Sequence, residues 1–224
     1  MFATTPLRIV AVSAGLSQPS STRLLADRLA AATRERLAAE QDRNVEVRNV
    51  EVQVIEVRDL AVDIAHHLLS GFPSATLREA IDAVTEADGL IAVTPVFTAS
   101  YSGLFKSFFD LIDNTALTGK PVVIAATGGT ARHSLVLEHA LRPLFAYLRA
   151  VTVPTSVYAA SEDWGSSGDE YTEGLPSRIR RAGGELASAV LGRTVSGASR
   201  SPGLDDGEDA VVPFEQQLAD LRLD

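Results

Sequence analysis

The sequence contains no cysteine among its 224 residues. This absence excludes disulfides, thiolate catalysis, zinc–thiolate sites and cysteine-ligated iron–sulfur clusters. No apolar run approaches the roughly 20 residues that span a bilayer, and the apolar start at 7–14 is too short, and lacks the basic flank, for a signal peptide. Positive charge is also scarce: the net charge of −9 argues against nucleic acid or an anionic membrane as the main partner. We therefore expect a soluble cytoplasmic protein.

Short apolar runs alternate along the chain with segments of helical periodicity. Five runs are predicted to be strands, at residues 7–12, 45–57, 90–94, 121–126 and 151–159. Helices are predicted from Ser21, over 76–86, from Tyr101, and over 134–149 and 176–191, whereas 58–73 is interpreted as a connection. This alternation predicts an α/β fold with a doubly wound, five-stranded parallel sheet in the order 2-1-3-4-5 and helices on both faces. Valines alternate with polar residues in the second run, which places it at an edge.

Hydrophobic residues make up 46% of the chain, enough to build a sizeable core. Residues 1–192 are expected to form a single domain. Beyond Gly192 the composition changes to glycine, serine and acidic residues, so 193–224 are predicted to form a mobile acidic tail.

The loop after the first predicted strand is rich in hydroxyl groups. Ser17, Ser20, Ser21 and Thr22 lie just before or at the start of a helix. A helix N-terminus is electropositive and has free N–H groups, so together with these hydroxyls it can bind a phosphate. The loop lacks the Gly-Lys-Ser/Thr of an NTPase loop and the Gly-x-Gly-x-x-Gly of a dinucleotide fold, which favours a monophosphate. The alternative is that Ser20 or Ser21 only caps the helix.

Two further loops follow predicted central strands. Pro95 cannot donate to a sheet, so the third strand is expected to end at Thr94, ahead of a loop over 96–100. The fourth strand leads into 127–130, with Arg132 and His133 just beyond. All three loops follow the carboxyl ends of strands, where open α/β sheets bind ligands. A phosphate and a ring are expected to bind together between the first and third strands.

Side chains suited to hydrolysis do not form a recognisable pattern. Ser100 and Ser102 lack a Gly-x-Ser-x-Gly context, and His133 and His139 follow no triad order. Where side chains offer no acid, base or nucleophile, a cofactor can carry the chemistry. Hydride transfer through a flavin fits these loops.

The loops resemble segments of a known family. Residues 94–106 (TPVFTASYSGLFK) resemble the flavin-ring segment of the NAD(P)H-dependent FMN reductases, which have a flavodoxin-like fold. Residues 126–133 (ATGGTARH) and 140–144 (ALRPL) resemble the second ring loop and the helix that follows it. The resemblance covers roughly residues 7–160. It is greatest to reductases that serve two-component flavin monooxygenases, including the alkanesulfonate and luciferase-like types. It implies hydride transfer from NADPH or NADH to FMN, and a partner monooxygenase.

The same resemblance implies a set of cofactor-binding residues in the three loops. The FMN phosphate and the start of the ribityl chain would contact Ser13, Gly15, Ser17, Gln18, Ser20, Ser21, Thr22 and Arg23. The isoalloxazine would contact Pro95, Val96, Phe97 and Ser100, with Tyr101 beside it or at a subunit interface. The pyrimidine side of the ring and the nicotinamide would contact Thr127, Gly128, Gly129 and His133. The family's first loop commonly carries an arginine that this chain lacks, so Arg23 is expected to supply the positive charge. No catalytic side chain and no metal ligand is expected.

Other functions are compatible with this fold. One is a quinone, azo-dye or metal-ion reductase with tightly bound FMN. Another is a flavodoxin-like one-electron carrier, although its usual Thr-x-Thr-Gly-x-Thr phosphate loop is missing from the chain. A third is a flavin-binding regulatory protein without turnover.

The helix expected from Tyr101 also predicts self-association. Phe105, Phe108 and Phe109 make it more aromatic than one core-facing stripe requires, because Phe108 and Phe109 diverge by about 100°. The ring left uncovered would pack against another subunit, which predicts a homodimer or a tetramer built from dimers.

Overall fold

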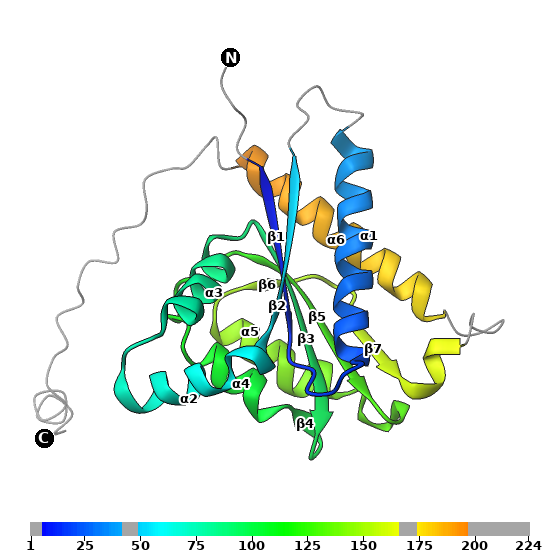
Figure 1. Cartoon of the computed structure of the whole chain (residues 1–224). Helices are drawn as coiled ribbons and strands as arrows, with labels where there is room; N and C mark the ends of the chain where they lie inside the picture. Colours follow the sequence, from blue (N-terminus) through cyan, green and yellow to red (C-terminus); the bar gives the residue numbers. More distant parts are fainter. Residues whose placement is uncertain (1–5, 42–48, 166–173, 197–224) are drawn as a thin grey trace, which may run out of the picture. The chain divides into compact units, whose positions relative to one another are not determined.

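The computed structural model describes residues 6–41, 49–165 and 174–196 (Figure 1). The described residues up to Gly192 form one compact unit. Its strands are β1 (Leu7–Ser13), β2 (Val50–Glu56), β3 (Gly89–Phe97), β4 (Ser100–Tyr101), β5 (Pro121–Gly128), β6 (Val151–Thr152) and β7 (Val157–Ala160). They form one sheet in the order β2-β1-β3-β5-β6, with β7 also paired to β5, and β4 to β3. The predicted parallel, doubly wound order is confirmed, with the fifth predicted strand divided into β6 and β7.

Helices cover both faces of the sheet (Figure 1). One face carries α1 (Ser21–Gln41) and α6 (Leu175–Ser196). The other carries η1 (Val57–Leu60), α2 (Ala61–Ser70), α3 (Ala75–Glu86), α4 (Gly103–Phe109), the π-helix η3 (Leu137–Leu141) and α5 (Arg142–Tyr147). Along β1, Ile9 and Ala11 face the first of these cores, and Val10 and Val12 face the second. Burial on both faces explains why β1 lacks polar alternation.

The ends of several predicted elements differ from the structure. The helix α6 continues to Ser196, past the predicted end at 191. Residues 197–224, most of the predicted tail, lie outside the described residues, as do residues 42–48 of the predicted second strand. No helix in the described ranges is long and apolar enough to cross a membrane.

The interpretation of 58–73 as a connection is wrong. The segment contains the end of η1 and the ten-residue helix α2, which ends at Gly71 in the left-handed conformation, with φ of 77°. Only Ile64 of α2 is buried, because the helix packs through one narrow contact. The helix is only ten residues long, and the adjacent His66 and His67 are interpreted from the sequence as part of an irregular connection.

The prediction that the third strand ends at Thr94 is also wrong. The strand β3 continues through Pro95 to Phe97 and turns back into β4 as a hairpin. Its ladder with β1 ends at Val93, so at Pro95 the strand has only β5 beside it. A proline is tolerated where one side of a strand is free of a ladder.

The aromatic residues of α4 do not provide the uncovered ring on which the predicted self-association was based. Phe105, Phe108 and Phe109 are all buried within the chain. Their rings pack in one cluster with Phe145 of α5 in tilted and edge-to-face arrangements, and the ring centroids of Phe109 and Phe145 lie 5.1 Å apart. The helix is buried on two sides by its own chain, because α2 and α5 flank it.

Candidate functional site

The first loop, residues 14–20, connects β1 to α1 and is folded back on itself. A side chain at Gly15 would place its Cβ 2.0 Å from the Ser20 hydroxyl oxygen and 3.0 Å from the Cβ of Thr22. Glycine is therefore needed at this position for space rather than for an unusual dihedral angle. Ser20 caps α1, because its hydroxyl accepts a hydrogen bond from the Arg23 N–H at 3.2 Å.

Two buried hydroxyls join the first loop's helix to the end of β5. The Thr22 and Thr127 hydroxyl oxygens lie 2.8 Å apart, and both side chains are buried. The Ser13 hydroxyl, at the end of β1, is also buried, but within the described residues it has no hydrogen-bond partner. A buried hydroxyl without a partner is costly in an apolar setting, so Ser13 is a candidate ligand-binding group.

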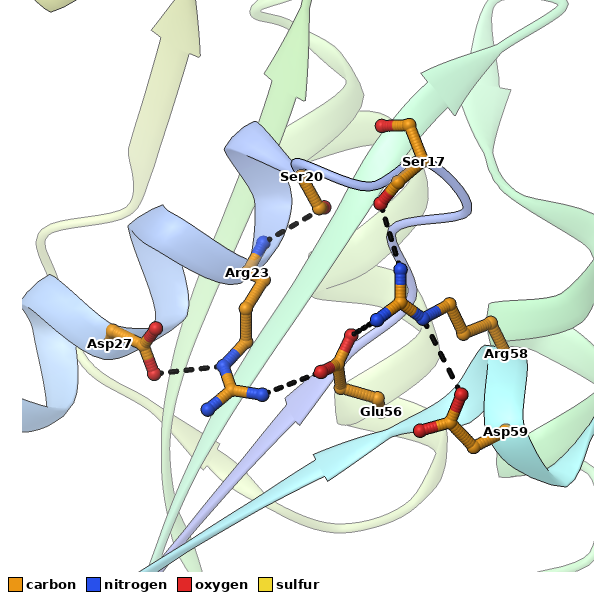
Figure 2. Close-up of polar contacts among 7 residues, drawn as sticks. All are labelled: Ser17, Ser20, Arg23, Asp27, Glu56, Arg58 and Asp59. Atoms are coloured by element: carbon orange, nitrogen blue, oxygen red, sulfur yellow. Dashed lines mark hydrogen bonds and ion pairs between the residues drawn. The ribbon is translucent and has the colours of Figure 1, made fainter.

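A cluster of charged side chains lies beside the first loop (Figure 2). Arg23 contacts the Asp27 carboxylate at 2.9 Å and the Glu56 carboxylate at 2.6 Å, and hydrogen bonding to Asp27 is the main cause that raises the pKa of Arg23. The other Glu56 oxygen lies 2.6 Å from Arg58, which donates to the Ser17 carbonyl oxygen at 2.8 Å. The Arg23 guanidinium is thus paired with carboxylates rather than free.

Sequence reasoning missed Glu56 and Arg58. Arg58 lies 41 residues from Ser17 in the chain, in the segment read as a connection, and it belongs to no local motif. The register supplies the link: Glu56 is the sheet partner of Ser13, so the end of β2 lies beside the start of the first loop. Only the pairing of β2 with β1 could have revealed it.

The second loop is the turn of the β3–β4 hairpin. Thr98 and Ala99 both have positive φ, at 49° and 65°, an uncommon conformation for residues other than glycine. The hairpin is held by pairing of Val96 with Tyr101 and of Phe97 with Ser100. Further support comes from the buried Thr94 hydroxyl, which accepts a hydrogen bond from the Ser102 N–H at 3.0 Å. The turn exposes the Phe97 ring at the sheet's carboxyl edge, with 46% of its surface accessible.

The third loop follows β5 and is shaped by Tyr158 of β7. A Cβ on Gly128 would lie 2.0 Å from the Tyr158 hydroxyl, which donates to the Thr130 carbonyl at 2.8 Å. Burial raises the pKa of Tyr158, so the hydroxyl keeps its proton at neutral pH. Gly128 therefore has a packing reason, whereas a Cβ at Gly129 would meet nothing within 4 Å.

The structure brings the predicted residues to one edge of the sheet. They fall into three groups by exposure. The buried ones are Ser13, Gly15, Thr22, Pro95 and Thr127. The half-buried ones are Ser20, Arg23, Val96, Ser100, Tyr101 and Gly128, and the exposed ones are Ser17, Gln18, Ser21, Phe97, Gly129 and His133. The Thr22–Thr127 bond joins the start of α1 to the end of β5, next to the first and third loops. The second and third line a common pocket of about 330 Å³ through Ser100, Arg132 and His133.

Comparisons with known proteins agree with this arrangement. The sequence profile of the family described as NADPH-dependent FMN reductase matches residues 7–165. An FMN reductase (NADPH) of Pseudomonas aeruginosa is 40% identical over 194 residues, covering 85% of this chain and 96% of the relative. The NADH-dependent FMN reductase SfnF of Pseudomonas fluorescens is 40% identical over 187 residues, covering 84% and 93%.

Solved structures show the same likeness. An oxidoreductase from Corynebacterium diphtheriae superposes with a TM-score of 0.77 at 45% identity, covering 84% of this chain and 99% of that one. The apo form of the NADH:FMN oxidoreductase EmoB gives 0.66 at 31% identity, covering 83% and 89%. A WrbA-like flavodoxin from Agrobacterium tumefaciens, at 16% identity and a TM-score of 0.55, shares the fold, with 84% of this chain and 99% of that chain covered. By the profile match and these identities, the chain belongs to the NADPH-dependent FMN reductase family.

Proposed function

We propose that the protein transfers hydride from NADPH or NADH to FMN. The observation that carries this proposal is the convergence of three loops at the carboxyl edge of the sheet in a chain of the FMN reductase family. Ligands bind at this edge in doubly wound folds. The relatives named above include both NADPH- and NADH-dependent enzymes, so the choice of nicotinamide donor stays open to measurement.

In this proposal the first loop holds the FMN phosphate. The first turn of α1 has N–H groups that no helical carbonyl can accept from, of which that of Arg23 is capped by Ser20, and the Ser13 hydroxyl is buried with no partner in the described residues, a donor set that fits a phosphate. The hairpin would support the isoalloxazine through Phe97 and Tyr101, and the third loop would contact the ring's pyrimidine side through Gly128 and Gly129. FMN itself supplies the hydride-accepting chemistry, and the side chains bind and orient it.

We further propose that FMN is a substrate that leaves in reduced form for a partner monooxygenase. The charge cluster at the first loop supports weak binding, because two guanidinium groups face three carboxylates, of Asp27, Glu56 and Asp59. The cluster therefore adds no net positive charge to attract the phosphate dianion. Neither ring loop contains a tryptophan to stack on the flavin.

Steady-state oxidation of NADPH and NADH, with and without added FMN, tests the proposal. We expect a nearly colourless purified protein whose rate saturates with free FMN in the micromolar range. A yellow protein with stoichiometric FMN, and a rate that ignores added flavin, would instead favour a quinone, azo-dye or metal-ion reductase. Bound FMN without NAD(P)H oxidation would favour an electron carrier or a regulatory protein.

We also propose a homodimer, or a tetramer built from dimers. Because the aromatic residues of α4 are buried within the chain, the support comes from an apolar surface on and after α2, where Val62, Leu69 and Phe72 are 82%, 90% and 76% exposed. Val62 and Leu69 are seven residues apart and share one face of the helix. Clustered exposed apolar side chains are typical of interaction surfaces. Light scattering at micromolar concentration tests this, and a monomer would contradict it.

A further inference from the structure

We infer that Glu56 and Arg58 are positioning residues that hold the first loop in its phosphate-binding conformation before FMN arrives. This inference rests on the proposed binding of FMN and assigns a role to two side chains outside the three loops. Both lie where β2 ends and η1 begins, and each is only 16% exposed.

The first loop is tied to Glu56 at three points. At its start, Ser13 is the sheet partner of Glu56 in the parallel ladder of β1 and β2. Just past its end, Arg23 in the first turn of α1 binds one Glu56 oxygen at 2.6 Å. In its middle, the Ser17 carbonyl accepts a hydrogen bond from Arg58, whose guanidinium also binds the second Glu56 oxygen (Figure 2). The Glu56 carboxylate thus connects Arg23, just past the end of the loop, with Arg58 at its centre, while the Glu56 backbone pairs with the start of the loop.

The bond from Arg58 to Ser17 fixes the direction of a neighbouring donor. The Ser17–Gln18 peptide is trans, so its carbonyl and the Gln18 N–H point in opposite directions. Because Arg58 holds the carbonyl, the Gln18 N–H is directed away from Arg58, and a flip of this peptide would break the bond. Backbone N–H groups are the donors with which such loops bind phosphate.

The forked geometry of arginine is essential to this role. Arg58 uses one terminal nitrogen for the Ser17 carbonyl and the other for Glu56. A lysine carries the same charge on a single nitrogen and cannot reproduce this planar fork. Charge and geometry can therefore be separated by substitution. A loop that is already ordered loses less freedom when its ligand binds, which favours affinity.

Flavin titration of three variants tests the inference: Arg58→Lys, Arg58→Ala and Glu56→Gln. Dissociation constants are measured for FMN and for riboflavin, which lacks the phosphate. We expect each variant to weaken FMN binding about tenfold, which corresponds to 1.4 kcal/mol, and to change riboflavin binding less than about twofold. Arg8→Ala, which removes a surface ion pair with Glu86 at the start of β1, is the matched control and should leave both unchanged.

Glu56→Gln gives the sharpest result, because the two explanations predict opposite signs. It removes a negative charge near the phosphate, so pure electrostatics predicts tighter FMN binding. Loss of the ion pairs from Glu56 to Arg23 and Arg58, which connect the centre and the end of the loop, predicts weaker binding. Tighter binding in Glu56→Gln, wild-type affinity in Arg58→Lys, or an equal loss for riboflavin would each overturn the inference. If the wild-type protein binds no FMN, the proposed function fails instead.

Discussion

The buried hydrogen bond between Thr22 and Thr127 makes a quantitative prediction about stability. The two hydroxyl oxygens are 2.8 Å apart, and the residues are only 2% and 4% exposed. Thr22→Val keeps the shape of the side chain but leaves the Thr127 hydroxyl buried without a partner. The free energy of unfolding should fall by about 1–3 kcal/mol, the usual cost of a buried unsatisfied polar group. Thr127→Val should cost a similar amount.

The double variant Thr22→Val/Thr127→Val should be more stable than either single variant. Replacing both partners by apolar groups of the same shape removes the unsatisfied hydroxyl, and such exchanges are close to neutral. Urea denaturation followed by fluorescence of the single tryptophan, Trp164, measures all four proteins of the cycle, because Trp164 packs against the core on the α1 face. In a thermal scan, each 1 kcal/mol lost from the free energy of unfolding should lower the melting temperature by roughly 2–4 °C.

Additive losses in this cycle, within about 0.5 kcal/mol, would refute the reasoning, since uncoupled residues behave in that way. Thr33→Val is the matched control on the same helix. Its buried hydroxyl donates to the Leu29 carbonyl at 2.9 Å, which also lies in the helical ladder, so its loss should cost less. FMN affinity provides a second readout: a stable double variant that binds FMN normally would assign the two hydroxyls to structure, and one that does not would assign them to the ligand.

Three further substitutions have defined outcomes. Gly15→Ala displaces the Ser20 hydroxyl that caps α1 and places a methyl group 3.0 Å from the Thr22 Cβ and 3.2 Å from the Ser20 Cβ, so calorimetry should show a loss of about 1–3 kcal/mol, and flavin titration a weaker binding of FMN. Lys120→Met removes a buried ammonium group that donates to two carbonyls at the end of α3, so the free energy of unfolding should fall by about 2 kcal/mol in urea denaturation. The control Lys106→Met, at an exposed ion pair, should lower it by at most about 0.5 kcal/mol. Burial raises the pKa of Tyr158 in the folded state, so the unfolded chain releases the tyrosine proton at a lower pH than the folded protein does. The free energy of unfolding of the wild type should therefore fall as the pH rises above about 10. In alkaline denaturation, Tyr158→Phe should not show this fall.

Much of the sheet could be predicted because its signals are local. Unbroken apolar runs mark β1, β3 and β5 as buried on both faces, and the valine–polar alternation of β2 marks it as an edge. The helix α2 and the β3–β4 hairpin could not be predicted from the sequence, for different reasons. The helix is only ten residues long and buries a single residue, Ile64, while its apolar Val62, Leu68 and Leu69 are exposed, so its apolar residues do not mark a core-facing side. The hairpin contradicts its own local preferences, since Thr98 and Ala99 adopt a turn normally made by asparagine and glycine.

The site shows the same division between local and long-range information. Hydroxyls before α1 and glycines after β5 are visible as motifs in the sequence. The sequence does not show why these residue types are needed. Gly128, for example, leaves space for Tyr158, which lies 30 residues away in β7, and not only for a ligand. Arg58 is the extreme case. Its contact with Ser17 exists because β2 pairs with β1 in one particular register, which no spacing rule encodes.

The paired arginines suit the proposed role of the site, which is to hold a phosphate accurately and also to release it. Accuracy can come from fixed backbone donors, which Glu56 and Arg58 position, while attraction stays low because Arg23 and Arg58 are already neutralised. At an association rate of about 10⁶–10⁷ M⁻¹s⁻¹, a micromolar dissociation constant gives release at roughly 1–10 s⁻¹. A nanomolar constant would slow release about a thousandfold, too slow to supply a second enzyme in each cycle. A free arginine facing the phosphate would move the site toward that regime, so pairing each guanidinium with a carboxylate is the expected solution where flavin is a substrate.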